Sequence, residues 1–86
     1  MPHEIVFSSA ARRGIIAIPQ RIRAAIVEFV YGDLAASPRR VGKPLQRELT
    51  GLFAARRGTY RVIYEIDNDR ERVIIIRIAH RADAYR

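Results

Sequence analysis

The last third of the sequence contains two runs of apolar residues interrupted by polar ones, a pattern that is typical of neighbouring β-strands. The first run spans Tyr60–Ile66 and the second spans Arg72–Ala79, and both are rich in β-branched and aromatic residues that fit a pleated sheet. The residues between them, Asp67–Glu71, are polar and supply turn chemistry. The pattern therefore predicts an antiparallel hairpin in this part of the chain.

A side-chain period of two divides the residues of this hairpin between the two faces of a sheet. Arg61, Ile63 and Glu65 share one face of the first strand, whereas Tyr60 and Tyr64 lie on the other. On the second strand the residues expected to share one face are Val73, Ile75, Arg77 and Ala79, with Arg81 following if the strand continues. Leaving an arginine unpaired on a buried face is costly. One face is therefore expected to be core, and the other an exposed cationic surface.

The N-terminal half predicts one short strand followed by two helices. Glu4–Phe7 is the strand candidate, and the hydroxyl groups of Ser8 and Ser9 can cap a helix over Ala10–Ala17. A second helix is expected from Gln20 to about Leu34, because its apolar positions recur every three or four residues. The positions that form this stripe are Ile22, Ala25, Ile26, Phe29 and Val30. The two helices are expected to form a hairpin that packs on one face of the sheet.

Between the helices and the C-terminal hairpin, turn-forming residues surround one further strand. Proline and glycine in Ala35–Pro44 predict a loop. Leu52–Arg57 predicts a strand that joins the next one through a tight turn at Gly58 and Thr59. The predicted order is strand, helix, helix, strand, strand, strand, which indicates an α+β fold. We expect one domain over residues 1–86, with a mostly antiparallel four-stranded sheet and the first strand at an edge.

The charge of the chain indicates a polyanionic partner. Sixteen basic residues against nine acidic ones give a net charge of +7, and every basic residue except Lys43 is an arginine. Because the planar guanidinium group matches phosphate and stacks on bases, RNA, DNA or an acidic protein segment are the partner classes to consider. The alternative interpretation is that arginine-rich usage reflects a GC-rich genome and that much of this charge is merely solvated.

The composition excludes several other classes of site. The chain has no cysteine, which excludes a disulfide framework and thiolate metal sites, and His3 and His80 offer no metal-ligand spacing. No apolar run approaches the roughly 20 residues of a membrane span, and the N-terminus lacks the layout of a secretion signal. We therefore expect a cytoplasmic protein that needs neither a metal nor another cofactor.

The sequence also lacks a glycine-rich phosphate loop, a carboxylate pair at helical spacing and a serine or cysteine nucleophile motif. RNA can nevertheless be cleaved by attack of its own 2′-hydroxyl on the adjacent phosphate. A protein then needs only to align that hydroxyl, stabilise the phosphate charge and assist proton transfer. Arginine suits the second task, and histidine or tyrosine the third. A cationic sheet face is therefore compatible with a metal-independent ribonuclease and with a binding protein.

Three short motifs occur in a distinctive order. Gly42–Leu52 leads into the sheet, Gly-x-Tyr-Arg-Val-Ile-Tyr-Glu-Ile starts at Gly58, and an apolar strand then ends in His80-Arg81-x-x-x-Tyr85-Arg86. In this order and spacing, which cover nearly the whole chain, the sequence resembles the RelE branch of the RelE/ParE toxin family. The resemblance implies a twisted sheet with an N-terminal helical hairpin on one face.

The resemblance also implies a function. It implies the toxin of a type II toxin–antitoxin system that cuts messenger RNA in the ribosomal decoding site, leaves a 2′,3′-cyclic phosphate and thereby inhibits translation. The partners that it implies are a cognate antitoxin, the ribosome with its messenger RNA, and operator DNA through the toxin–antitoxin complex.

Four residues correspond to catalytic positions of the family. The resemblance implies that Arg61 stabilises charge at the scissile phosphate and that Arg81 stabilises the leaving side electrostatically. It implies that Tyr85 stacks on a splayed base or assists proton transfer, and His80 is the candidate that titrates near neutrality. The residues expected to contact RNA are Lys43, Arg47, Arg56 and Arg77. For Arg77, a structural cross-strand pair is the alternative.

One departure from the family's pattern keeps other functions open. Relatives often carry basic residues on alternate positions of the strand before Gly58, but Leu52 and Ala54 stand there in this chain and only Arg56 is basic. A lysine that would act as general base is therefore missing. A ParE-like DNA gyrase inhibitor, or a catalytically weak module that binds antitoxin and operator DNA, are the alternatives.

Overall fold

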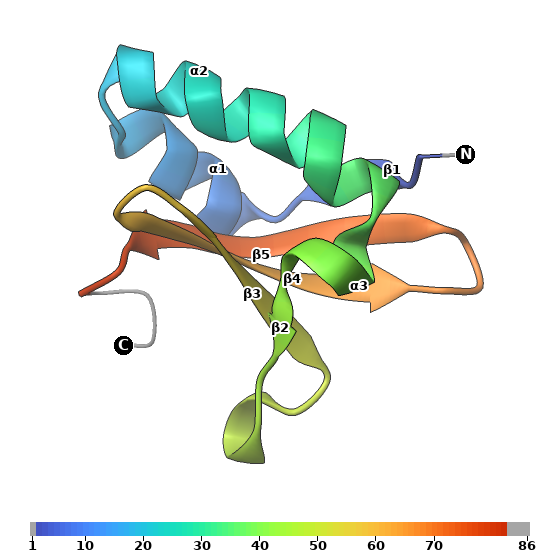
Figure 1. The fold of residues 1–86 in the computed structure, drawn as a ribbon. Coiled ribbons are helices and arrows are strands. Elements are labelled where there is room, and N and C mark those ends of the chain that lie inside the picture. Colours follow the sequence, from blue (N-terminus) through green and yellow to red (C-terminus); the bar gives the residue numbers. More distant parts are fainter. Residues whose placement is uncertain (1, 83–86) are drawn as a thin grey trace.

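The computed structural model describes residues 2–82 of the 86-residue chain (Figure 1). A short strand and two helices come first, and the strands of the hairpin sheet follow. The elements are β1 (Glu4–Phe7), α1 (Ser9–Ala17), α2 (Gln20–Phe29), a π-helical extension (Val30–Leu34), α3 (Pro38–Val41), β2 (Lys43–Pro44), a 3-10 turn (Arg47–Leu49), β3 (Leu52–Arg57), β4 (Tyr60–Asp67) and β5 (Arg72–His80).

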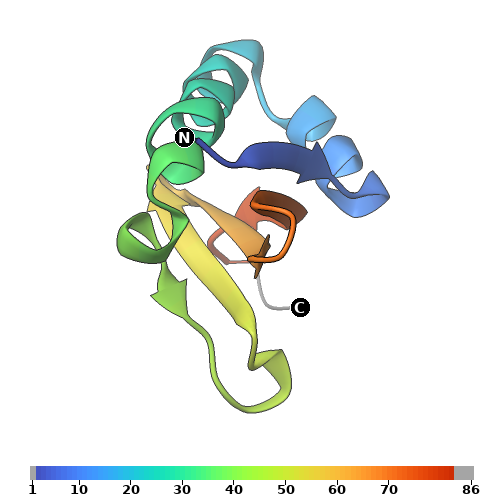
Figure 2. The same ribbon diagram turned by 90° about the vertical axis from the view of Figure 1, so that its right-hand side faces the viewer.

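The strands form one sheet in the order β1-β5-β4-β3-β2, in which β1 runs parallel to β5 and the other pairs are antiparallel. Helices α1 and α2 cover one face of this sheet (Figures 1 and 2). The predicted α+β class and the edge position of β1 are confirmed. The sheet has five strands rather than four, because Lys43 and Pro44, predicted to be loop, pair with β3. We call the face opposite α1 and α2 the open face.

The N-terminus of α1 is capped by Ser8, as its sequence predicts. The Ala11 N–H donates to Ser8 Oγ at 3.0 Å, and the same hydroxyl donates to the Ile76 carbonyl of β5 at 2.7 Å. Gly14 then lets the helix lie close to the strand, because a Cβ at this position would meet the Ile78 carbonyl oxygen at 2.4 Å. The Ser8 hydroxyl and the lack of a side chain at Gly14 thus let α1 pack directly on β5.

The second helix buries the later part of its predicted stripe. Ile26, Val30 and Leu34 are fully buried in the core. Ile22, predicted to belong to the same stripe, is 39% exposed. It lies in the first turn of α2, next to the exposed residues 19–21. The helix that the stripe predicts is confirmed, as α2 and its π-helical extension.

The β4–β5 hairpin contains a β-bulge. Ile63 pairs with Arg77, but its neighbour Tyr64 pairs with Ile75, so that Ile76 is the extra residue. An extra residue of this kind reverses the side-chain alternation beyond it. The faces on either side of the bulge must therefore be assigned separately.

The bulge overturns the face predicted for the second strand. Val73 and Ile75 are fully buried on the helix-covered face, where they pair with β1 and with the core side of β4. Arg77 and Ala79 share the open face with their partners on β4. The predicted grouping of all four residues was wrong, because it assumed an uninterrupted period of two.

Candidate functional site on the open face

Two arginines face each other across β3 and β4 on the open face. Arg56 pairs directly with Arg61, which places their Cβ atoms about 4.5–5.5 Å apart. Arg56 is exposed, whereas Arg61 is half-buried and its Nε atom is buried. Like charges directly opposite each other destabilise a sheet. A bound anion between the two guanidinium groups would relieve this repulsion.

A groove of about 520 Å³ lies beside this arginine pair. Its lining combines the two arginines and one lysine with apolar residues of α3, β2 and β3. The lining residues are Val41, Lys43, Pro44, Leu45, Ala54, Arg56 and Arg61. The groove therefore combines cations that suit a phosphate with apolar contact area.

Tyr64 holds the α3–β2 segment that forms one wall of the groove. It is fully buried on the helix-covered side, its hydroxyl donates to the Pro38 carbonyl at 2.5 Å, and its ring stacks on Phe53 with centroids 5.7 Å apart. The chain passes so close to this hydroxyl that only glycine fits at position 42, where a Cβ would lie 2.0 Å from the Tyr64 oxygen. Tyr64 and Gly42 therefore position Lys43 and the residues that follow it.

Because Tyr64 is buried, the free energy of unfolding is expected to depend on the ionisation of its phenol group, and therefore on pH. Desolvation raises the pKa of Tyr64 from 10.0 to about 12. The unfolded chain then loses the phenol proton at a lower pH than the folded chain does. Stability is therefore complete below pH 10 and is expected to fall by about 2 kcal/mol as the pH rises from 10 to 12. Urea unfolding at pH 8 and pH 11.5 measures this loss, and Tyr64→Phe should lose less over the same range. An equal loss in both proteins would contradict the assignment.

The other predicted site arginines differ in their position relative to the arginine pair. Arg77 is half-buried on the same face, opposite Ile63 and one row along from Arg61. Arg47 is exposed in the 3-10 turn between β2 and β3 and does not line the groove. Arg81 follows the end of β5, where its backbone N–H donates to the Thr59 carbonyl at 2.7 Å and its side chain is exposed. Arg56, Arg61, Lys43 and Arg77 thus share one face.

His80 lies on the other side of the sheet from Arg61. It pairs with Tyr60, whereas Arg61 pairs with Ala79, and alternation directs these two pairs to opposite faces. The His80 and Tyr60 rings form a T-shaped pair with centroids 5.6 Å apart, and His80 Nδ1 accepts the Ala82 N–H at 3.3 Å. Tyr85, the remaining candidate, lies outside the described residues.

The apolar residues of the groove were not predicted from the sequence. Ala35–Pro44 was predicted to be loop, but it contains α3 and β2, which bring Val41, Lys43 and Pro44 to the groove. A signal for α3 was present, because proline favours the first turn of a helix and Pro38 starts this one.

Negative charge gathers at the opposite end of the hairpin. Glu65, Asp67 and Asp69 line a shallow pocket around the β4–β5 turn, and Asp67 accepts from Arg72 Nε at 3.2 Å. Arg70 also pairs with Asp67 at this end, so the carboxylates there are partly neutralised. The Gly58 end, with Arg56, Arg57 and Arg61, is therefore the more cationic of the two ends and the one expected to attract a polyanion.

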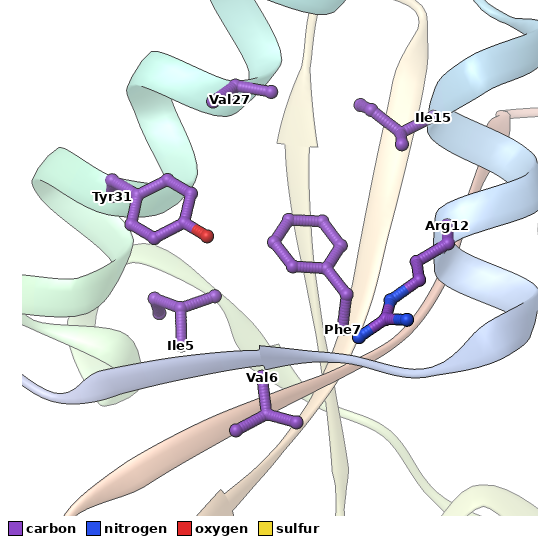
Figure 3. Close-up of a pocket in the computed structure, with 7 residues that line it drawn as sticks. All are labelled: Ile5, Val6, Phe7, Arg12, Ile15, Val27 and Tyr31. Atoms are coloured by element: carbon purple, nitrogen blue, oxygen red, sulfur yellow. The ribbon is translucent and has the colours of Figure 1, made fainter.

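A second groove, of about 480 Å³, lies on the helix-covered side between α1, α2 and β1 (Figure 3). Ile5 and Phe7 point into it from β1, Ile15 from α1, and Val27 and Tyr31 from the α2 side. Arg12 is the one charged residue among the described residues that line it. This groove is mainly apolar and separate from the arginine pair. None of the described helices is long and apolar enough to cross a membrane.

Comparison with known proteins identifies the family. Residues 5–85 match a family model described as the ParE toxin of type II toxin–antitoxin systems. Toxin RelG of Mycobacterium tuberculosis is 56% identical over 86 residues, which cover 100% of this chain and 99% of that protein. Toxin RelE of the same organism is 48% identical over 85 residues, which cover 99% of this chain and 88% of that protein.

Solved structures agree with this result. The toxin–antitoxin complex RelBE2 of M. tuberculosis contains a chain with a TM-score of 0.91 and 54% sequence identity, over 96% of this chain and 95% of that one. The isolated E. coli RelE toxin has the same fold, with a TM-score of 0.76 at 16% identity over 98% of this chain and 86% of that one. The protein therefore belongs to the ParE toxin family of type II toxin–antitoxin systems, and within it is a RelE-like toxin.

Proposed function

We propose that this toxin is a metal-independent endoribonuclease that cleaves messenger RNA on the ribosome and so inhibits translation. The observation that carries the proposal is the direct pairing of Arg56 with Arg61 beside Lys43. Three cations at one groove suit the pentacoordinate phosphate of a 2′-hydroxyl attack, which carries more negative charge than the ground state. The reaction leaves a 2′,3′-cyclic phosphate, because the attacking oxygen belongs to the substrate itself.

The arginine pair would supply most of the rate enhancement. The Arg61 Nε is buried, and we expect its guanidinium group to be preorganised and to need little rearrangement during the reaction. Arg56 is exposed and completes the phosphate site from the neighbouring strand. Arg81, just beyond β5, would stabilise the leaving 5′-oxygen electrostatically. Arg77 and Arg47 would bind the RNA backbone further along.

The groove has fewer groups suited to proton transfer than to stabilising the phosphate charge. Ala54 stands where a general base occurs in relatives, and His80 projects from the other face of the sheet. We propose that His80 at the end of β5, or Tyr85 beyond it, takes part in proton transfer when RNA is bound. Alignment of the 2′-hydroxyl and stabilisation of the phosphate charge then carry the larger share of catalysis.

A cognate antitoxin is the proposed protein partner. Relatives of this chain have been solved as toxin–antitoxin complexes. With a net charge of +7, the toxin would attract an acidic amphipathic segment, which would cover the open face and exclude RNA. Together the two proteins would bind operator DNA.

Inhibition of DNA gyrase is the second candidate function, and the ParE description of the matching family model favours it. A shared fold does not decide between the two, because function depends on the site that a fold carries. The pairing of Arg56 with Arg61 favours the ribonuclease, since a gyrase poison needs no phosphate site of this kind.

The proposal is tested by incubating the purified toxin with programmed ribosomes, with free messenger RNA, and with gyrase in a supercoiling assay. We expect new RNA ends that carry a 2′,3′-cyclic phosphate, and unchanged supercoiling. Inhibited supercoiling with intact RNA would support the gyrase candidate. If neither occurs, and expression without the neighbouring antitoxin is harmless, the protein is a binding module instead.

A further inference from the structure

The lining of the groove beside the arginine pair is partly apolar and partly cationic. Val41, Pro44, Leu45 and Ala54 contribute to its lining, next to Lys43, Arg56 and Arg61. A site for phosphate alone would need only the cations. The apolar residues therefore suit a ligand that has a flat, partly apolar group as well as an anionic one. A nucleotide has both groups, in its base and its phosphate.

The small side chain of Ala54 keeps this groove open. Ala54 lies on the open face between Lys43 on β2 and Ile63 on β4, and it is one row along from the Arg56–Arg61 pair. Its methyl group leaves space where a longer side chain would project. The volume of about 520 Å³ falls within the range of small-ligand sites, about 300–1,000 Å³.

We propose that this groove holds one nucleobase of the bound RNA strand, while Arg56 and Arg61 hold the adjacent phosphate. The inference rests on the proposed ribonuclease function and adds a base-binding subsite to it. The base would lie against Pro44 and Leu45, with its edge over Ala54. Guanidinium groups at the groove can stack on the base as well as bind phosphate.

The lining also predicts how the subsite discriminates between bases. Among the described residues that line it, the side chains are either cationic or apolar, without a carboxylate, amide or hydroxyl group. The three cations can donate to acceptors on a base edge, but none of these side chains can accept from it. Binding then depends mainly on contact area, so purines should bind better than pyrimidines.

The direct test uses fluorescence anisotropy with a labelled purine trinucleotide whose 2′-hydroxyls are methylated to prevent cleavage. Versions that lack one base at a time are compared with the complete trinucleotide. For the wild-type toxin, loss of the base in the groove should weaken binding about tenfold, in line with the usual contribution of a stacked base. Arg56→Ala should weaken binding of the complete and the abasic versions by the same factor.

Two variants test the groove itself. Ala54→Leu fills it, and the wild-type difference between the complete and the abasic trinucleotide should disappear. Leu45→Ala removes one wall but keeps the backbone bond from Leu45 N–H to the Leu52 carbonyl at 2.8 Å, so it should fold and show a reduced difference. Ala24→Leu, at an exposed position of α2, is the matched control and should behave like the wild type.

The outcomes separate this inference from the function on which it rests. If the wild type cleaves RNA but binds every abasic version as tightly as the complete trinucleotide, the base subsite is overturned and the ribonuclease stands. A base dependence that persists unchanged in both Ala54→Leu and Leu45→Ala would place the base elsewhere and also overturn the inference. If the wild type neither binds nor cleaves RNA, the subsite and the proposed function both fail.

Discussion

Replacing Arg61 with alanine is expected to lower the rate of RNA cleavage by about 10²–10³-fold, the usual cost of removing one preorganised donor from a developing negative charge. Arg61 is the member of the arginine pair whose Nε is buried, and it faces Arg56 directly. Cleavage rates on programmed ribosomes measure the loss. Arg61→Lys should recover only part of it, because an ammonium group lacks the planar fork of arginine.

The matched control is Arg57→Ala. Arg57 is the next residue along β3 after Arg56, but alternation turns it to the other face, where it lines a pocket beside α2. Its loss removes the same charge without touching the phosphate site, so cleavage should be nearly unchanged. His80→Ala should cost less than Arg61→Ala, since His80 lies across the sheet from the arginine pair. Equal losses in Arg57→Ala and Arg61→Ala would mean that only the overall charge matters.

Replacing Gly42 with alanine is expected to destabilise the protein by about 3 kcal/mol. The added methyl group would lie 2.0 Å from the Tyr64 hydroxyl and 3.1 Å from the Ala54 carbonyl. Either the buried phenol or the α3–β2 segment must then move, and the hydrogen bond to Pro38 is lost. Chemical denaturation monitored by circular dichroism measures the change.

Gly32→Ala provides the matched control for this prediction. Gly32 lies in the π-helical extension of α2, and a Cβ built there would meet nothing within 4 Å. Alanine should be neutral or slightly stabilising at this position, because it lowers the entropy of the unfolded chain. If Gly42→Ala were as harmless as Gly32→Ala, the close approach of Tyr64 to the chain would not be a packing constraint.

Elements with a local signal could be predicted from the sequence. Ser8 caps α1 as expected, and the turn at Gly58 and Thr59 joins β3 to β4 as expected. The bulge at Ile76 was not predictable. The four residues Val73–Ile76 are all β-branched and apolar, so no polar residue among them reveals the change of register. The face of a strand is then decided by packing against β1 and the helices, which a local pattern does not contain.

In the candidate site too, features with a local sequence signal could be predicted and features set by long-range packing could not. Arg61 could be singled out because it interrupts an apolar run, and strand alternation correctly separated it from Tyr60 and Tyr64. The wall of the groove depends on contacts between residues distant in sequence, such as the bond from Tyr64 to Pro38. No local pattern reports such a contact, so β2 and the apolar lining were missed.

The position of β5 governs when a newly made copy can fold. This strand pairs with both β1 and β4, and α1 packs closely on it, yet it is the last strand to be synthesised. While β5 is still inside the ribosome, the N-terminal strand has no neighbour to pair with and the helices have no complete sheet to cover. Contacts between such distant parts of a chain form late. The sheet therefore cannot be completed before β5 has left the ribosome.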